Sequence, residues 1–260
     1  MIYQGKIARN LLKGGMTLLN KHSGEPPTKI KESLTDGAVR SLREWIFARG
    51  LRTGDLLPSE SELCAELNVG RNSLREAVRT LRATGVLEVK QGAGTYVGVL
   101  SLKSMSDELI FHSRLAVDDQ ESYLRSLTEV RESLEQGLIT NLITEGLKPN
   151  FEVLEKILEQ MDEEAKSGFV TSATDRHFHE ELLAPLNNPL SILLLQVFWR
   201  IFDELLDSRY DPVAAGKTAD RHHAILLAIK SADARGARIA INSHFDGLRN
   251  RIGSRDFKID

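Results

Sequence analysis

Residues 58–97 constrain the fold of this chain more than any other stretch. Ser59 and Glu62 have the spacing of a capping box, which predicts the start of a short helix. After an Asn-Val-Gly turn, apolar residues at helical spacing predict a second helix over 72–84. Two short alternating segments within 86–99 flank a glycine-rich turn and predict a β-hairpin. This order of elements predicts a winged helix-turn-helix, which places its second helix in the DNA major groove.

A further helix precedes this stretch. Apolar residues recur at helical spacing over 34–50, and Gly50 occupies the position where a helix often ends. We therefore expect the DNA-binding domain to cover 34–98. Residues 1–33 mix glycine, lysine, asparagine and proline, which predicts a flexible arm in which Met16 is an alternative translation start.

The outer face of the second predicted helix carries groups that suit DNA. Backbone amides, asparagine and serine at a helix N-terminus bind phosphate, and arginine can bond a guanine edge with two donors. Glycines in the hairpin permit close approach to the sugar-phosphate backbone. For any single arginine, a solvated helix face is the alternative interpretation. The candidate DNA-binding residues are Arg71, Asn72, Ser73, Arg75, Arg79, Gln91 and Gly92.

The pattern changes after residue 98. We expect a linker over 99–104, an all-α bundle over 105–253 and a tail over 254–260, because long amphipathic segments replace strand signals. Prolines fall at or near the predicted helix boundaries, where they are tolerated. The chain is therefore predicted to be mainly α. The expected bundle helices are 104–114, 119–146, 149–166, 172–184, 188–209, 217–230 and 233–253.

Composition limits the class of protein. The chain has 260 residues, of which 41% are hydrophobic and 27% charged, as in a globular protein with a real core. Its single cysteine, Cys64, fits a reducing compartment, and no segment reaches the ~20 apolar residues that span a bilayer. We expect a cytoplasmic protein with no membrane partner. The net charge is −3, and the basic excess lies within 1–98, so only that part suits a polyanion.

The predicted bundle holds a second group of polar candidates. Asp175 and His179 are four residues apart, so both project from one face of a helix. His222 and His244 lie among apolar residues in the last two predicted helices. Three imidazoles and a carboxylate that meet inside a bundle would suit a divalent metal such as Zn²⁺. Buried, hydrogen-bonded core histidines are the alternative.

The first region resembles the DNA-binding domain of the GntR transcriptional regulators. The resemblance is carried by LLPSESEL and NVGRNSLREAVRTLRATGVLEVKQGAGTYV. The chain departs from the family pattern at Ser61, where arginine is common, and at Gly70, where threonine or serine is common. Its operator sequence is therefore the least transferable property. The resemblance implies DNA contacts by Arg71, Asn72, Arg75, Gln91 and Gly92.

Residues 105–253 resemble the FCD effector domain of the FadR-type subgroup of that family. The resemblance is carried by LTEVRESLEQGLI, DRHFHEELL, RHHAILLAI and INSHFDGL. It implies a divalent metal, Zn²⁺ first with Ni²⁺ or Mn²⁺ as alternatives. It also turns Arg131 toward an effector cavity, and Arg200 is a second candidate that could instead pair with Asp203 or Glu204. The implied metal ligands are Asp175, His179, His222 and His244.

Together these features predict a ligand-responsive transcriptional regulator. We expect a repressor that binds a pseudo-palindromic, double-stranded operator as a homodimer and responds to a small organic acid or sugar acid. We expect no enzymatic activity. A metal-dependent hydrolase or lyase is the first alternative, although Leu183 stands where an HExxH motif needs its second histidine. A metal-free regulator that responds to an acyl ligand is the second.

Overall fold

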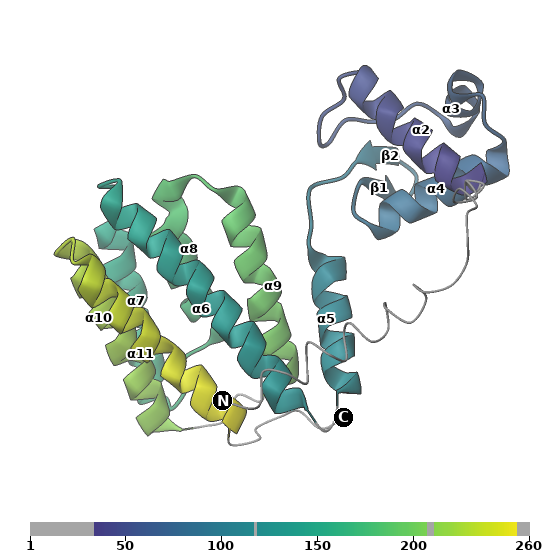
Figure 1. Cartoon of the computed structure of the whole chain (residues 1–260). Coiled ribbons are helices and arrows are strands. Elements are labelled where there is room, and N and C mark those ends of the chain that lie inside the picture. The colour runs from purple at the N-terminus through teal and green to yellow at the C-terminus, as the bar shows by residue number, and fades with distance from the viewer. Residues whose placement is uncertain (1–33, 117–118, 207–210, 254–260) are drawn as a thin grey trace, which may run out of the picture. The chain divides into compact units, whose positions relative to one another are not determined.

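The computed structural model describes residues 34–116, 119–206 and 211–253 (Figure 1). The predicted arm over 1–33, with Met16, and the predicted tail over 254–260 lie outside these residues. The described chain forms two compact units. One contains residues 34–52 and 57–80, and the other contains residues 53–56 and 81–253.

The first unit is helical. It contains α2 (Leu34–Ala48), α3 (Glu60–Leu67) and most of α4 (Arg71–Ala83). The predicted capping box is present, since Glu62 N donates to Ser59 Oγ and Ser59 N donates to Glu62 Oε2. Asn68 ends α3 in the left-handed conformation, with φ 51°, which asparagine tolerates. The small core of this unit consists of Ala38, Leu42, Ile46, Leu57, Leu63, Leu74 and Ala77.

The hairpin belongs to the second unit. Strands β1 (Leu87–Lys90) and β2 (Gly94–Val97) pair antiparallel, with Leu87 opposite Val97 and Lys90 opposite Gly94. Gly94 has φ +119°, and a Cβ there would lie 2.7 Å from a methyl carbon of Leu56. Glycine is therefore required at this position, both for the backbone angle and for space.

The rest of the second unit is a helical bundle. The helix α6 lies beside α11, and α10 lies beside both α11 and α7, while α8 lies beside α7 and α9 beside α5 (Figure 1). This confirms the predicted fold class, mainly α with an N-terminal winged helix-turn-helix. The elements are α5 (Lys103–Leu115), α6 (Gln120–Thr144), α7 (Phe151–Lys166), α8 (Ser172–Leu183), η1 (Ala184–Leu186), α9 (Pro189–Leu205), α10 (Pro212–Lys230) and α11 (Ala234–Gly253).

Two predicted helix boundaries are wrong. The helix expected to end at residue 209 ends at Leu205, where Leu206 takes an extended conformation. The helix expected to begin at residue 217 begins at Pro212, because Asp211 caps it. Oδ1 of Asp211 accepts from the amides of Val213 and Ala214, each at 3.0 Å. Proline suits the first turn of a helix, since its missing N–H would have no partner there. The extra turn was missed because Pro212 marks a helix start as readily as a break.

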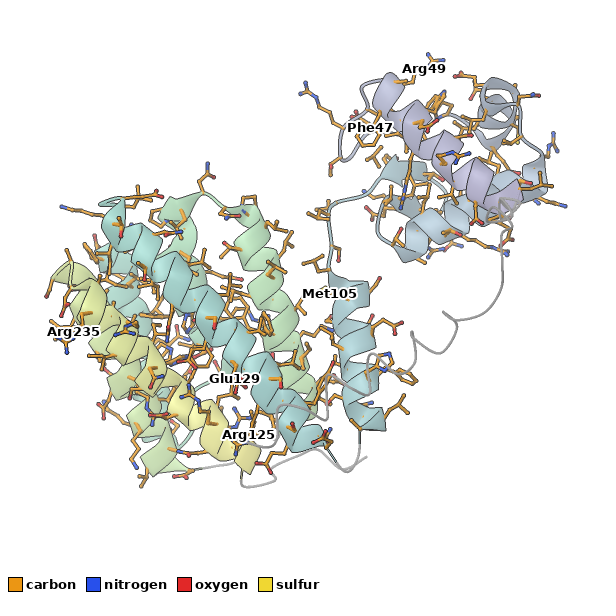
Figure 2. The ribbon with its side chains drawn as sticks, in the orientation of Figure 1. Phe47, Arg49, Met105, Arg125, Glu129 and Arg235 are labelled. Carbon is orange, nitrogen blue, oxygen red and sulfur yellow. The ribbon has the colours of Figure 1, made fainter. Side chains whose placement is uncertain are left out.

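The bundle interior is apolar around an embedded polar region. Fully buried side chains such as Phe178 and Phe245 pack between the helices, while Glu129 projects from α6 to the surface (Figure 2). A second apolar cluster joins α5, α6, α9 and α11 and includes Leu124 and Phe202. Among the described residues, no helix combines the length and apolar character needed to cross a membrane.

Candidate DNA surface and candidate metal centre

The candidate DNA-binding residues of α4 are largely exposed. Arg71, Asn72, Arg75 and Arg79 are exposed and Ser73 is half-buried. Leu74 and Ala77 fill the opposite face and are fully buried, so packing in the first unit fixes which face of α4 meets solvent. The sequence periodicity predicted this division.

Two of these arginines form exposed ion pairs. Arg75 Nε donates to Oε1 of Glu60 on α3 at 2.8 Å, and Arg79 Nη1 donates to Glu76 at 2.7 Å. Exposed pairs of this kind contribute about 0–1 kcal/mol, so phosphate or a base edge can replace the glutamate at little cost. The arginines are therefore available to DNA.

The start of α4 offers backbone donors. Leu74 N donates to Gly70 O at 3.0 Å, which places Gly70 at the N-terminal cap. Glycine has no side chain to accept from the first amides, so these stay available to an anion. The departure from threonine or serine at this position thus exchanges a side-chain cap for additional phosphate donors.

The wing presents Gln91 and Gly92 at its exposed tip. Gly92 has φ +75°, and Ala93 N donates to Lys90 O to close the turn. The Lys90 ammonium lies 4.8 Å from the centre of the Tyr96 ring, so it stays near the turn. The wing therefore carries a cation and open backbone at the same end.

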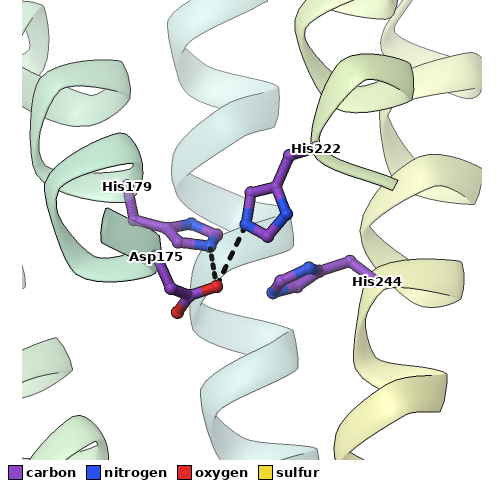
Figure 3. Close-up of side chains that lie close together, drawn as sticks. All are labelled: Asp175, His179, His222 and His244. Carbon is purple, nitrogen blue, oxygen red and sulfur yellow. Dashed lines mark ion pairs between the residues drawn. The ribbon is translucent and has the colours of Figure 1, made fainter. Parts of the chain in front are cut away.

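The second candidate site lies inside the bundle (Figure 3). Asp175 and His179 come from α8, His222 from α10 and His244 from α11. One ligand atom from each lies within 4.8 Å of the other three. Atoms bound at 2.0–2.2 Å to one ion are at most about 4.4 Å apart, so shifts of a few tenths of an ångström would bring these four onto one metal.

Neighbouring acceptors orient two of the imidazoles. His222 Nδ1 lies 2.8 Å from Thr218 O, one turn earlier in α10, and His179 Nδ1 lies 3.0 Å from Oε2 of Glu135 on α6. Because a carbonyl oxygen only accepts, Nδ1 of His222 carries the proton and its Nε2 presents a lone pair to the cluster. The Glu135 carboxylate favours the same tautomer in His179, although that contact lacks hydrogen-bond alignment. Such outer partners fix the tautomer of metal-binding histidines.

Several buried imidazole nitrogens of these residues have no hydrogen-bond partner in the described protein. They are Nε2 of His179, Nε2 of His222 and Nδ1 of His244. His222 Nε2 lies 3.0 Å from Asp175 Oδ1, but without hydrogen-bond alignment. Buried polar atoms are almost always paired, so unpaired nitrogens beside a carboxylate are suited to bind a cation. The residues present suit a divalent metal such as Zn²⁺.

The electrostatics agree with this interpretation. Burial raises the pKa of Asp175, but the approach of His222 and the charge of His179 outweigh it and hold that pKa well below its usual range. Burial and the neighbouring imidazoles lower the pKa of His244. Burial lowers the pKa of His179, yet the Glu135 carboxylate more than compensates and raises it. The cluster therefore has an anionic carboxylate and at least one imidazole held neutral, as metal ligands must be.

Arg131 lies beside this cluster. It is 5% exposed, its Nε donates to Glu135 Oε1 at 2.7 Å, and its Nη2 is 3.9 Å from Asp175 Oδ2. That Nη2 is buried without a hydrogen-bond partner among the described residues. Arg131 therefore keeps a donor that a ligand carboxylate could use.

Glu135 is a candidate positioning residue that the sequence reasoning missed. It is fully buried and contacts both Arg131 and His179, so one carboxylate holds an effector candidate and a metal-ligand candidate. Burial alone would raise the pKa of Glu135. The charges of His179 and Arg131 outweigh burial and hold that pKa below its usual range, so the carboxyl stays ionised. The sequence did contain a sign of the contact with Arg131: Glu135 follows Arg131 by four residues, so the two side chains lie on one helix face.

Arg200 has a different environment. It pairs with Asp107 and donates to Ser106 Oγ at 3.1 Å, both on α5, so it ties α9 to α5. The two acids considered as its partners receive other arginines: Asp203 pairs with Arg176 and Glu204 with Arg114. Among the described residues, the polar contacts of Arg200 lie on α5 and not at the cluster, so they support a structural role.

Neighbouring titratable residues stay out of the cluster. His177 is exposed and lies 3.8 Å from Glu181, and His223 faces Asp162 of α7. Glu180, the acid of the incomplete HExxH motif, accepts from Gln196 at 3.4 Å. The cluster therefore contains four ligand candidates but no nearby general base from that motif.

Comparison with known families places both units. Residues 34–97 match the family described as bacterial regulatory proteins, gntR family, and residues 126–247 match the FCD domain. Residues 120–125 of α6 and all of α5 precede the second match.

Known relatives and structures match along most of their length. The HTH-type transcriptional regulator LutR of Bacillus subtilis is 30% identical, over 68% of this chain and 89% of that protein. The galactonate operon transcriptional repressor of Escherichia coli is 25% identical, over 79% and 91%. The solved Streptococcus agalactiae GntR structure has a TM-score of 0.60 and 26% identity, covering 83% of this chain and 99% of that one.

A winged helix-turn-helix and a helical effector domain in one chain define a DNA-binding transcriptional regulator, not an enzyme. The chain belongs to the GntR family, with a C-terminal FCD domain. This confirms the family inferred from the sequence.

Proposed function

We propose that this regulator is a repressor whose affinity for its operator is set by a small carboxylate bound at a divalent metal. One observation carries the proposal. Asp175, His179, His222 and His244 meet in the bundle with nitrogens that lack protein partners, and a spare donor of Arg131 lies beside them. Such a site suits a ligand that brings oxygen atoms.

Asp175 and the three histidines would hold the metal, with Zn²⁺ as the first candidate and Ni²⁺ or Mn²⁺ as alternatives. Bound there, the metal supplies positive charge and open coordination positions for a ligand oxygen. Arg131 would bind the same carboxylate through Nη2, since arginine matches carboxylate geometry well. This polar cluster argues against the metal-free acyl-ligand alternative, because an alkyl chain would leave its nitrogens unpaired.

The DNA side of the proposal uses two copies of the chain. One winged helix contacts too few base pairs for strong selectivity, so we propose a homodimer on a two-fold operator. Arg71, Asn72, Ser73, Arg75 and Arg79 of α4 would contact one half-site, with Gln91 and Gly92 of the wing on the backbone. A relative named as a repressor supports the direction of control, and galactonate in its name is a sugar acid.

Regulation requires that the effector favour one arrangement of the dimer. A ligand with equal affinity for the DNA-bound and free arrangements would shift nothing. We propose that the carboxylate binds the free arrangement more tightly, so that it lowers operator affinity. A tenfold loss corresponds to a difference of about 1.4 kcal/mol in ligand binding.

The test starts with metal analysis of the purified chain and selection of bound duplexes from a random pool. We expect about one metal per chain and an inverted repeat. Operator affinity is then measured with organic acids and sugar acids, with and without a chelator. Release of DNA by an acid in the metal-loaded protein supports the proposal. Absence of metal, or an operator affinity that no acid changes, would contradict it.

A further inference from the structure

Trp199 on α9 has a buried indole N–H that lacks a partner. The side chain is 4% exposed, and Nε1 makes no hydrogen bond within the described residues. A buried tryptophan usually donates to an acceptor. Even the half-buried Trp45 has a partner, because its Nε1 donates to Glu66 at 2.7 Å. Trp199 is therefore the exception between the chain's two tryptophans.

The Trp199 ring lies against the candidate metal centre. Its centroid is 6.3 Å from that of His179. The guanidinium carbons of Arg131 and Arg176 each lie 5.6 Å from the ring centre. Arg176 follows Asp175 in α8 and pairs with Asp203 through Nη2. One indole thus contacts a metal-ligand candidate and two cations.

The indole and the two neighbouring guanidinium groups each have a hydrogen-bond donor without an acceptor within the described residues. Arg131 Nη2, Arg176 Nε and Trp199 Nε1 are all buried and unpaired within the described chain. Three unsatisfied donors around one ring cost free energy unless something supplies lone pairs. A carboxylate that gives one oxygen to the metal and the other to Arg131 has no third oxygen for the indole N–H. A ligand with a further oxygen near its carboxylate would satisfy both.

We propose that Trp199 is a specificity-determining donor, which bonds a hydroxyl or keto oxygen adjacent to the effector carboxylate. The effector class is then the hydroxy acids and keto acids, and simple alkyl acids are excluded. This inference rests on the carboxylate site of the proposed function. Rejection of alkyl acids follows because they would leave a buried N–H without an acceptor.

The experiment compares acids that share a carbon skeleton and differ in oxygen content. Full-length chain with Zn²⁺ is titrated with L-lactate against propanoate, and with D-galactonate against hexanoate, by calorimetry. We expect the better-bound hydroxy acid to be favoured about tenfold over its partner. In W199F, which keeps an aromatic ring but has no donor, that preference should fall to about twofold. W45F is the matched control and should keep the full preference.

A second measurement removes the dependence on W199F folding. In W45F labelled with ¹⁵N-tryptophan, the single indole signal belongs to Trp199, and it should move on adding the hydroxy acid but not the alkyl acid. Equal affinity for paired acids, an unchanged preference in W199F, or an indole signal that ignores the bound hydroxy acid overturns the role of Trp199 alone. Failure of every acid to bind overturns the carboxylate site itself, and this inference with it.

Discussion

The DNA-facing helix and the bundle cluster hold their functional side chains in opposite environments. Arg75 has 60% of its side chain exposed and pairs with a half-exposed glutamate. His179 and His222 are fully buried, and Nε2 of each has no hydrogen-bond partner within the described residues. Water can hydrogen-bond to the exposed arginine, whereas the buried imidazole nitrogens are shielded from solvent.

This difference explains how each site can be recognised. An exposed arginine has many possible solvent and ion partners, so its contacts say little about function. A DNA-binding role is inferred instead from the sequence pattern around it. A buried nitrogen without a partner is costly, so its environment indicates a ligand directly.

Replacing His179 with alanine should weaken zinc binding by about a hundredfold or more, because one of four ligands supplies a large share of the binding free energy. Metal analysis and competition with a chelator measure the loss. Zinc should also no longer raise the melting temperature of the variant. His177→Ala on the same helix is the control, since that side chain is exposed and faces Glu181. Equal zinc affinity in both variants would contradict the assigned site.

Replacing Arg75 with alanine should weaken operator binding by about 1–3 kcal/mol and relax selectivity at one base position. The physical reason is loss of a two-donor contact to a base edge. Fluorescence anisotropy with the selected operator and its single-base variants measures both effects. Arg82→Ala, in the last turn of α4, should change affinity much less. If selectivity survives in the Arg75 variant, the orientation assigned to α4 is wrong.

Replacing Glu135 with glutamine should lower zinc affinity about 10–100-fold, because the amide no longer fixes the protonated Nδ1 of His179 as a carboxylate does. It should also weaken effector binding, since Arg131 loses its orienting partner. Glu132→Gln on the same helix is the control, because Glu132 instead holds Asn242 and Arg249. Both affinities are measured by calorimetry. A zinc affinity equal to that of the control would remove Glu135 from the site.

Replacing Glu164 with glutamine should lower the free energy of unfolding by about 1 kcal/mol at pH 7. Glu164 accepts from Thr171 N and Thr174 Oγ1 at the start of α8, which carries Asp175. Burial raises the pKa of Glu164, but the Thr174 hydroxyl and other donors lower it below 4.5.

The sign of its pH dependence follows from that shift. A carboxyl whose folded pKa lies below its unfolded value stabilises the protein above the unfolded pKa and loses the effect as pH falls through the folded one. The difference between wild type and Glu164→Gln should therefore be present at pH 7 and shrink as the pH falls below the unfolded pKa of glutamate, about 4.3. Denaturation at several pH values measures it. Glu163→Gln, an exposed neighbour paired with Lys166, should show little difference at any pH.

The sequence predicted much of the DNA-binding region because its signals are local. Ser59 and Glu62 are three residues apart, and the alternation of buried Leu74 and Ala77 with exposed Arg75 and Arg79 repeats within one helix. The start of α10 shows the limit of such signals. Pro212 is compatible with either a break or a first turn, and only the cap by Asp211 distinguishes them.

The bundle site was only partly accessible. Spacing placed Asp175 and His179 on one face of α8, and family resemblance added His222 and His244. Glu135 was missed, although it lies one helical turn from Arg131, because a glutamate on a charged helix usually faces solvent. The partner of Arg200 was missed because Asp107 is more than ninety residues earlier in the chain.

Residue types and their spacing were enough to predict the order of elements, the exposed face of α4 and the placement of Asp175 and His179 on one helix face, since each depends on residues within a few turns. Tertiary structure decided that α6, α9, α10 and α11 bring Glu135, Trp199, His222 and His244 to α8. The physical reason is that apolar stripes from different helices choose their partners by packing, and only that packing decides which polar groups are buried together without solvent.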